Sequence, residues 1–286
     1  MARRSALGRA AGAAALTAIA VAAVALAVLA IQHGRPPASA ATARPVPTFE
    51  IESPSPTPTP TPTPSAPTAD RFLSVGAAAA WRATSGACDG TSPVIEWSGD
   101  DGLTWTDVTP EGIGAVRSLT SFGGVNATAV VDAASACDTV ALSSFTSGAY
   151  WQTYDNLFAA ASYLTADPGQ VVVAGDAIAA PCSTPRNLRV DGTIALLCED
   201  VAYARSGTEW NQLATGVVAL AVDPAGVVTA ARTDACAGIE LTRYDGQAGG
   251  TPACLTVADP AAPLAIDLDQ GEVVAWSGDE VARLSR

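Results

Sequence analysis

A short turn sequence that ends in tryptophan limits the fold of this chain more than any other feature. Its complete copy, SGDDGLTW, holds Ser98, Asp100, Gly102, Thr104 and Trp105 at fixed offsets. The Asp carboxylate and the two hydroxyls can bond backbone groups of a tight turn, and the glycine supplies a backbone conformation with positive φ. The tryptophan has a large apolar face to bury between neighbouring sheets. We therefore expect a hairpin turn with a structural role, held against the next sheet by its aromatic end.

The same turn returns twice in weaker form. The shorter copies keep only part of the pattern, namely Ser144, Gly148 and Trp151 in one and Gly207 and Trp210 in the other. The three glycines of the copies are 46 and 59 residues apart along the chain. Short apolar runs alternate with Gly, Asp, Pro and Ser clusters between them, which indicates many short strands joined by turns. A repeat of this size predicts the four-stranded blade of a β-propeller.

The complete copy resembles an Asp-box, the hairpin signature of BNR-repeat β-propellers. That group includes sialidases, sortilin-type receptors and photosystem II assembly factors, and the segment AAAAWRATSG before the box is similar to the assembly-factor branch. The resemblance implies an all-β propeller, and it carries little information about function because one fold hosts many activities.

The complete turn and its two partial copies predict about five four-stranded blades. Their boundaries are expected near 72–112, 113–166, 167–215, 216–258 and 259–286. The last blade is one strand short, so we expect Arg71–Gly76 to complete it. Such closure leaves the ring without an exposed sheet edge.

The six cysteines indicate an oxidising compartment and three disulfides. In the blade pattern, Cys88, Cys137, Cys198 and Cys236 precede a third strand, and Cys182 and Cys254 lie in connections between blades. Both kinds of loop emerge on one face, opposite the boxes. We favour the pairs Cys182–Cys198, Cys236–Cys254 and Cys88–Cys137, with Cys137–Cys182 as the competing choice.

The first residues predict a membrane anchor. Residues 1–34 hold three arginines followed by an apolar run long enough to cross a bilayer, which places the N-terminus in the cytoplasm. Residues 35–69 form a Pro/Thr-rich segment expected to be a disordered, extended linker. Residues 70–286 are then the extracytoplasmic propeller of a single-pass membrane protein. The alternative is a signal peptide cleaved near Ala40, which would release the protein.

The charge and the residue types exclude several classes of function. The formal net charge is −13, and residues 70–286 hold 10 arginines against 26 acidic residues, so nucleic acid is not an expected partner. The only histidine is His33, and no CxxC spacing occurs, so neither a metal site nor a cofactor is expected. No serine nucleophile has a histidine of the propeller to activate it.

Three functions are compatible with this pattern. The favoured one is a non-catalytic, membrane-tethered scaffold that binds a protein or envelope component through loops on the disulfide face. The first alternative is a sialidase-like glycoside hydrolase, which the Asp-box suggests although no catalytic residues can be identified from the sequence. The second alternative is a purely structural envelope or assembly protein.

Overall fold

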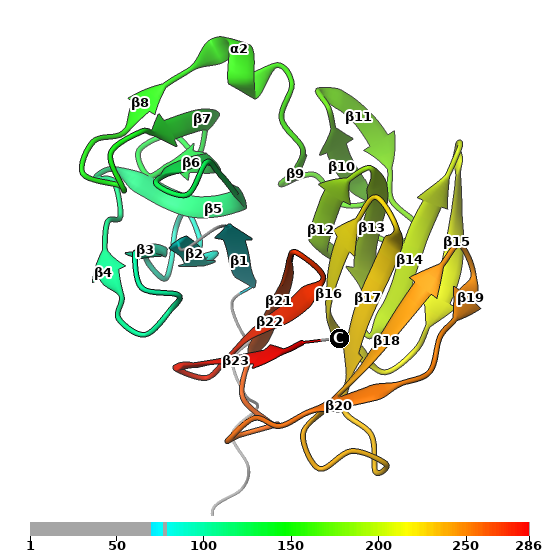
Figure 1. Cartoon of the computed structure of the whole chain (residues 1–286). Coiled ribbons are helices and arrows are strands. Elements are labelled where there is room, and N and C mark those ends of the chain that lie inside the picture. The colour runs from blue at the N-terminus through cyan, green and yellow to red at the C-terminus, as the bar shows by residue number, and fades with distance from the viewer. Residues whose placement is uncertain (1–69, 77–78, 286) are drawn as a thin grey trace, which may run out of the picture. The chain divides into compact units, whose positions relative to one another are not determined.

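The computed structural model describes residues 70–76 and 79–285, and these residues form an all-β propeller of six sheets (Figure 1). The expected number of five blades is therefore wrong, although the fold class is confirmed. The expected anchor and linker, residues 1–69, lie outside the described residues. Within the described part of the chain, no helix has the length and hydropathy needed to cross a bilayer.

The first three sheets, blades 1 to 3, are antiparallel and follow the chain. Blade 1 consists of β1 (Arg71–Gly76), β2 (Ala79–Thr84), β3 (Val94–Ser98) and β4 (Thr106–Asp107). Blade 2 consists of β5 (Ile113–Phe122), β6 (Asn126–Ala133), β7 (Thr139–Ser144) and β8 (Gln152–Thr153). A short helix, α2 (Asp155–Phe158), leads to blade 3, which consists of β9 (Tyr163–Leu164), β10 (Gln170–Val173) and β11 (Asp176–Ala179).

The last three sheets, blades 4 to 6, are built in the same way. Blade 4 consists of β12 (Pro185–Asp191), β13 (Thr193–Cys198), β14 (Val201–Ser206) and β15 (Glu209–Ala214). Blade 5 consists of β16 (Val217–Asp223), β17 (Gly226–Ala231), β18 (Ile239–Asp245), β19 (Ala248–Gly249) and β20 (Ala253–Leu255). Blade 6 consists of β21 (Leu264–Asp269), β22 (Glu272–Ser277) and β23 (Glu280–Leu284).

The difference between the five expected blades and the six observed lies at blade 3. Its three strands have two to four residues each, and no turn of this sheet carries a serine and a tryptophan at the offsets of the box. Residues 163–179 were therefore divided between the expected blades 113–166 and 167–215. The structure instead makes them a separate sheet, in which β10 pairs with both β9 and β11.

The ring closes without a shared strand. The innermost strands β1, β5, β9, β12, β16 and β21 contact each other in this order, and β21 contacts β1. The expectation that Arg71–Gly76 completes the last blade is wrong, because this segment is β1 and pairs with β2. Side chains join the two ends instead: the Arg71 guanidinium donates to Pro263 O at 3.1 Å and to Gly278 O at 2.7 Å.

Alanine and valine fill the interfaces between blades. The cluster between blades 5 and 6 contains Ala219, Ala221, Ala230 and Ala275, all at most 1% exposed. Small side chains let the twisted sheets approach closely, which explains the high alanine content without helices. Further buried clusters join blades 1 and 2, 3 and 4, 4 and 5, and 6 and 1. In the described chain, none of these clusters joins blade 2 to blade 3.

Three disulfides connect neighbouring loops: Cys88–Cys137, Cys182–Cys198 and Cys236–Cys254. These are the three pairs that the sequence favours. The first joins blades 1 and 2, the second ties the connection before β12 to the end of β13, and the third lies within blade 5. Four of the cysteines follow second strands. Because strands alternate in direction, these loops lie at the end of the blades opposite the turns that carry the boxes.

Candidate functional site

The turn Ser98–Trp105 between β3 and β4 is held by its own side chains. Ser98 Oγ donates to Asp100 Oδ1 at 2.8 Å and accepts Gly102 N at 2.8 Å. Thr104 donates to Asp100 twice, through its backbone N at 2.8 Å and its hydroxyl at 2.6 Å. Gly102 has φ of 86°, a region that other residues rarely adopt. These bonds are local, so this turn is a structural element.

The copies differ in how much of this pattern they keep. In blade 2, Ser144 Oγ accepts Gly148 N at 2.9 Å, and Thr146 Oγ1 accepts Tyr150 N where the complete box uses its aspartate. In blade 4, the turn between β14 and β15 holds only Gly207 and Thr208, so the polar part of the box is lost.

The three box tryptophans lie against the preceding blade. Trp105 packs on Leu73 and Trp276 of the cluster between blades 1 and 6. Trp151 donates its indole N–H to Val108 O of blade 1 at 2.8 Å, and Trp210 donates to Ala179 O of blade 3 at 2.8 Å. Each ring therefore holds two neighbouring sheets together, and none lines a ligand pocket.

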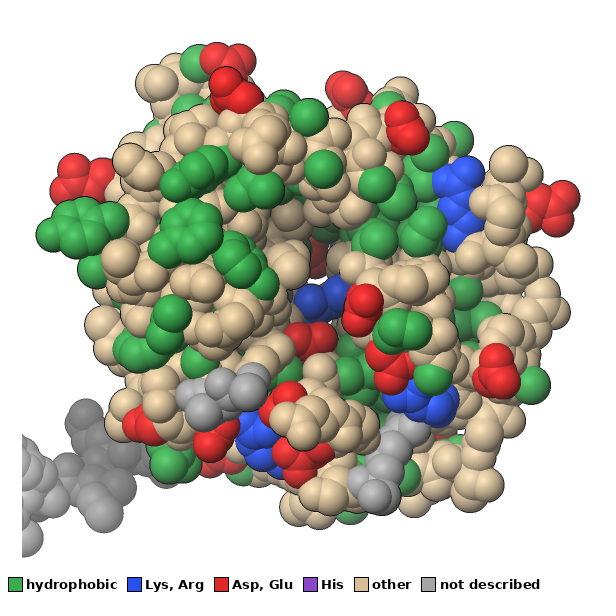
Figure 2. All heavy atoms as spheres, turned by 45° about the horizontal axis from the view of Figure 1, so that its top comes forward, with side chains coloured by type: hydrophobic (Ala, Val, Ile, Leu, Met, Phe, Trp, Pro, Cys, Tyr) green, Lys and Arg blue, Asp and Glu red, His purple; other side chains and the backbone are tan. Residues whose placement is uncertain are grey.

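A cavity of about 390 Å³ lies on the axis of the ring, at the ends of the innermost strands. It receives residues from β1, β5, β12, β16 and β21, together with Ser162 just before β9. Figure 2 shows acidic and basic side chains around a central hollow on this face. The charged residues of the lining are Arg189, Asp191, Asp223 and Asp267. The residues of this axial pocket belong to no sequence motif, and sequence reasoning missed all of them.

A β-bulge in β12 places Arg189 in the pocket. The pairing with β13 shifts between Arg186 and Arg189, and Asn187 has φ of 52°. The Asn187 amide oxygen accepts the buried Leu220 N at 2.8 Å, which fixes the bulge against β16. A bulge of this kind re-aims the side chain that follows it.

From β12, the Arg189 side chain crosses the axis of the ring. Its guanidinium donates to Leu73 O on β1 at 2.9 Å and to Ile266 O on β21 at 3.2 Å. In the ring order, β12 stands opposite β1, so one side chain connects blades 4, 1 and 6. Burial lowers the pKa of Arg189, and the charge of Asp267 opposes that shift.

The three carboxylates of the pocket have different surroundings. Asp223 forms a bidentate ion pair with Arg243, at 2.8 and 2.6 Å, and has a lowered pKa because of it. Asp267 is half-buried and accepts Val75 N at 2.8 Å; burial raises its pKa, although the Arg189 charge acts against this. Asp191 is exposed at the rim, and its charge adds to the rise at Asp267.

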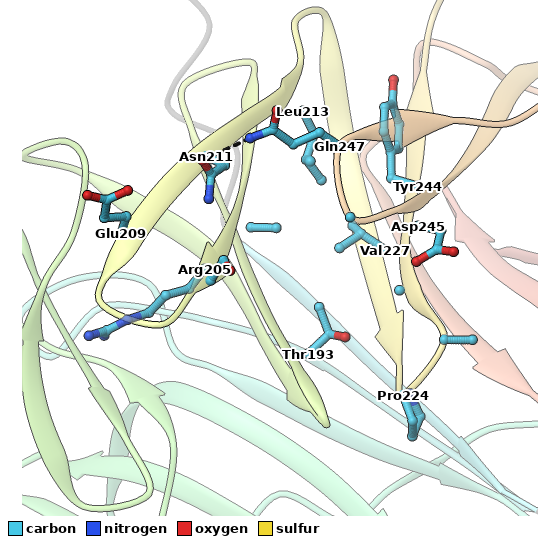
Figure 3. Close-up of a pocket in the computed structure, with 15 residues that line it drawn as sticks. Thr193, Arg205, Glu209, Asn211, Leu213, Pro224, Val227, Tyr244, Asp245 and Gln247 are labelled. Carbon is cyan, nitrogen blue, oxygen red and sulfur yellow. Dashed lines mark hydrogen bonds between the residues drawn. The ribbon is translucent and has the colours of Figure 1, made fainter.

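A second cavity, of about 460 Å³, lies between blades 4 and 5 (Figure 3). Asn211 and Gln247 meet in it, and the Gln247 amide donates to Asn211 Oδ1 at 2.9 Å. Figure 3 shows the Arg205 and Glu209 side chains pointing away from its centre. This cavity therefore lacks the converging charged groups of the axial pocket, so the axial pocket is the better candidate site.

The described residues contain no group of three or more His, Cys, Asp or Glu side chains placed to hold a metal ion. The axial pocket agrees with this finding, because an arginine stands among its carboxylates.

No protein-family model matches the chain, and no curated protein sequence is similar to it. Among solved structures, it is similar to the GH74 enzyme of Niastella koreensis, at 15% identity over 74% of this chain and 36% of that one, with a TM-score of 0.39. A family 117 glycoside hydrolase of Zobellia galactanivorans is 12% identical over 75% and 83%, with a TM-score of 0.36. A sialidase described as Hadza microbial is 9% identical over 75% and 51%, with a TM-score of 0.34.

The chain spans about a third of the Niastella enzyme and half of the sialidase. Several of the similar structures are described as glycoside hydrolases, which agrees with the first alternative rather than with the favoured expectation of a non-catalytic scaffold. That expectation is therefore corrected. These likenesses concern the propeller fold, and they assign neither a reaction nor a substrate to this chain.

Proposed function

We propose that the propeller is a glycoside hydrolase whose reaction takes place in the axial pocket. The observation that carries the proposal is the pairing of a half-buried carboxyl, Asp267, with an exposed carboxylate, Asp191, in one cavity beside Arg189. Hydrolysis of a glycosidic bond needs two carboxyl groups, one to protonate the leaving oxygen and one to act at the opposite side of the sugar. Different surroundings for two carboxyls are the usual way to divide these roles.

In this proposal, Asp267 is the acid and Asp191 is the base or nucleophile. Burial favours the protonated form of Asp267, so it can give a proton to the leaving oxygen. The exposed Asp191 can activate water or attack the anomeric carbon. The charge of Arg189 acts against the rise in the pKa of Asp267. Ser74, Ser121 and Thr120 supply hydroxyls that can bond sugar hydroxyls.

The lining favours a neutral sugar over an acidic one. It presents two carboxylates besides the protonated Asp267, and two N–H groups of its one guanidinium already donate to Leu73 O and Ile266 O. A sialic acid carboxylate would meet repulsion there, since like charges in a partly buried site cost free energy. Neutral glycosides are therefore the proposed substrates, rather than the sialosides that the Asp-box resemblance suggests.

The test is hydrolysis of a panel of aryl glycosides by the purified full-length protein. The panel contains glucosides, galactosides, xylosides, arabinosides, mannosides and a sialoside. We expect activity on at least one neutral glycoside, and a loss of kcat/KM of about 10²–10⁴-fold in Asp267→Asn and in Asp191→Asn. Asp176→Asn, on the exposed strand β11, is the matched control. Activity that survives both pocket substitutions would contradict the proposal.

Three further assignments are proposed with it. The hydrogen bonds of Ser98, Asp100, Gly102 and Thr104 support a true Asp-box in blade 1. The apolar run in residues 1–34 supports a membrane anchor, and the Pro/Thr-rich residues 35–69 support a spacer beneath an extracytoplasmic propeller. Retention of the protein in the membrane fraction after a high-salt wash is the expected result. Release into the medium would favour cleavage near Ala40.

A further inference from the structure

Three aromatic side chains of blade 2 form an exposed surface. Phe122 ends β5, Phe145 lies in the turn after β7, and Tyr154 follows β8. The ring centroids of Phe122 and Phe145 are 5.7 Å apart, and those of Phe145 and Tyr154 are 5.8 Å apart, both in edge-to-face geometry. Phe122 is 40% exposed and Phe145 is 49% exposed. We call these three residues the aromatic surface.

Packing between blades does not account for the aromatic surface. The interface of blades 1 and 2 already contains its own aromatic pair, Trp81 and Trp151, with centroids 5.8 Å apart. Two half-exposed phenylalanines in contact are unusual on a soluble domain, and such groups mark binding sites.

The aromatic surface lies next to the axial pocket along β5. Ser118, Leu119, Thr120 and Ser121 of β5 line the pocket, and Phe122 is the next residue of the same strand. Figure 2 shows hydrophobic side chains beside the central hollow, over the blade of β5 to β8. A molecule bound in the pocket would therefore extend over these rings if it is longer than the pocket.

The chemistry of the surface selects a neutral occupant. Its three side chains carry no charge at neutral pH, and the chain around them has a net charge of −13, which repels acidic polymers. The C–H face of a sugar ring is apolar and flat and packs well on an aromatic side chain, while the sugar hydroxyls stay in water. We propose that the aromatic surface binds the chain of a neutral polysaccharide that enters the axial pocket, an inference that rests on the proposed function.

Affinity electrophoresis tests this inference. The full-length Asp267→Asn protein is run in gels that contain xylan, mannan, galactan, arabinan or a soluble β-glucan, with polygalacturonate as the acidic comparison. We expect retardation by at least one neutral polymer and none by polygalacturonate. Phe122→Ala and Phe145→Ala together should weaken that retardation at least tenfold. Leu103→Ala is the control, because Leu103 is 83% exposed and lies in the box turn of blade 1.

The outcomes separate this inference from the proposed function. Retardation that depends on the two phenylalanines, without hydrolysis by the wild-type protein, would support polysaccharide binding by the aromatic surface and contradict the proposed hydrolase activity. Hydrolysis of aryl glycosides without retardation by any neutral polymer would support the hydrolase activity and contradict polysaccharide binding by the aromatic surface. Equal retardation of the phenylalanine variants and the Leu103→Ala control would also overturn it. A smaller apparent size of the phenylalanine variants in gel filtration would also contradict the inference, because the aromatic surface would then be the interface between two copies of the protein.

Discussion

At the scale of single residues, the same side chain type has opposite roles in the box and in the pocket. Asp100 accepts hydrogen bonds from Thr104 and Ser98, which lower its pKa to about 2. Asp267 is half-buried, and burial raises its pKa. Bonds to the charged form favour ionisation, whereas loss of water disfavours it. The first aspartate therefore suits a structural turn, and the second suits proton transfer.

Asp100 makes the box turn sensitive to acid. Its pKa in the folded protein, about 2, is below the ordinary value of 3.8, so its stabilising contribution is present above pH 4 and is lost as the pH falls towards 2. We expect Asp100→Asn to lower the melting temperature at pH 6 and to have a smaller effect near pH 2. Thermal unfolding of both proteins across this range measures the difference. An effect of equal size at both pH values would contradict the role of its charge.

Asp267 sets the alkaline limit of the proposed activity. An acid catalyst must be protonated, so kcat/KM should fall as the pH rises through the pKa of Asp267, which is above 3.8. Arg189 lowers that pKa. Arg189→Met should therefore move the alkaline limb to higher pH. A pH profile of the two proteins, with circular dichroism as a check on folding, measures this shift. An unmoved limb would show that Arg189 does not tune Asp267.

At the scale of elements, the bulge in β12 connects sequence to site. Asn187 tolerates positive φ better than most residues, and its amide oxygen accepts the buried Leu220 N. This single residue therefore joins blades 4 and 5 and also turns the following segment so that Arg189 reaches the axis of the ring. The geometry of the axial pocket therefore depends on a position outside its lining.

Substitutions at Asn187 should separate these two effects. Asn187→Gly keeps the backbone conformation and loses the bond to Leu220 N, which should cost about 1–3 kcal/mol of the free energy of unfolding. Asn187→Ala loses the bond and also strains φ, for a total of about 2–4 kcal/mol. Urea denaturation of both variants and of the wild-type protein measures the two losses. A loss in Asn187→Ala no larger than in Asn187→Gly would contradict the strain at φ.

The parts of the fold that the sequence predicts are those set by local patterns. The box turn can be recognised because all of its bonds lie within Ser98–Trp105. The alternation of strand directions places the cysteines on one face, and the favoured pairs are a choice among those that this face allows, with Cys88–Cys137 reached by elimination. Blade 3 could not be predicted because its turns carry no box. The axial pocket escaped because its residues lie at the ends of innermost strands and meet only after ring closure, and because nothing near Arg189 shows that its side chain crosses the axis.

At the scale of the whole molecule, the six interfaces of the ring are unequal. Five have a buried hydrophobic cluster in the described chain, and the interface between blades 2 and 3 does not. There, the two-residue strand β9 and the helix α2 stand where other blades have longer strands. Local opening needs less free energy where fewer apolar contacts are lost.

Hydrogen exchange should reveal this weak interface. We expect amides of residues 155–164 to exchange faster than those of the central strands β13 and β17, which are buried on both sides. Exchange followed by mass spectrometry of peptides measures the order. Equal protection of these segments would show that the ring opens as a unit. A ligand that spans the aromatic surface and Ser162 should slow exchange at 155–164.

Because Arg189 crosses the axis of the ring, it limits how a bound molecule can enter and leave the axial pocket. The Arg189 guanidinium is hydrogen-bonded to both β1 and β21, so it blocks the axis of the ring for a molecule that enters the pocket from the charged side. Under the proposed function, substrate would enter and product would leave on the same side of the ring. The end of a bound sugar polymer, rather than its middle, would then reach Asp267.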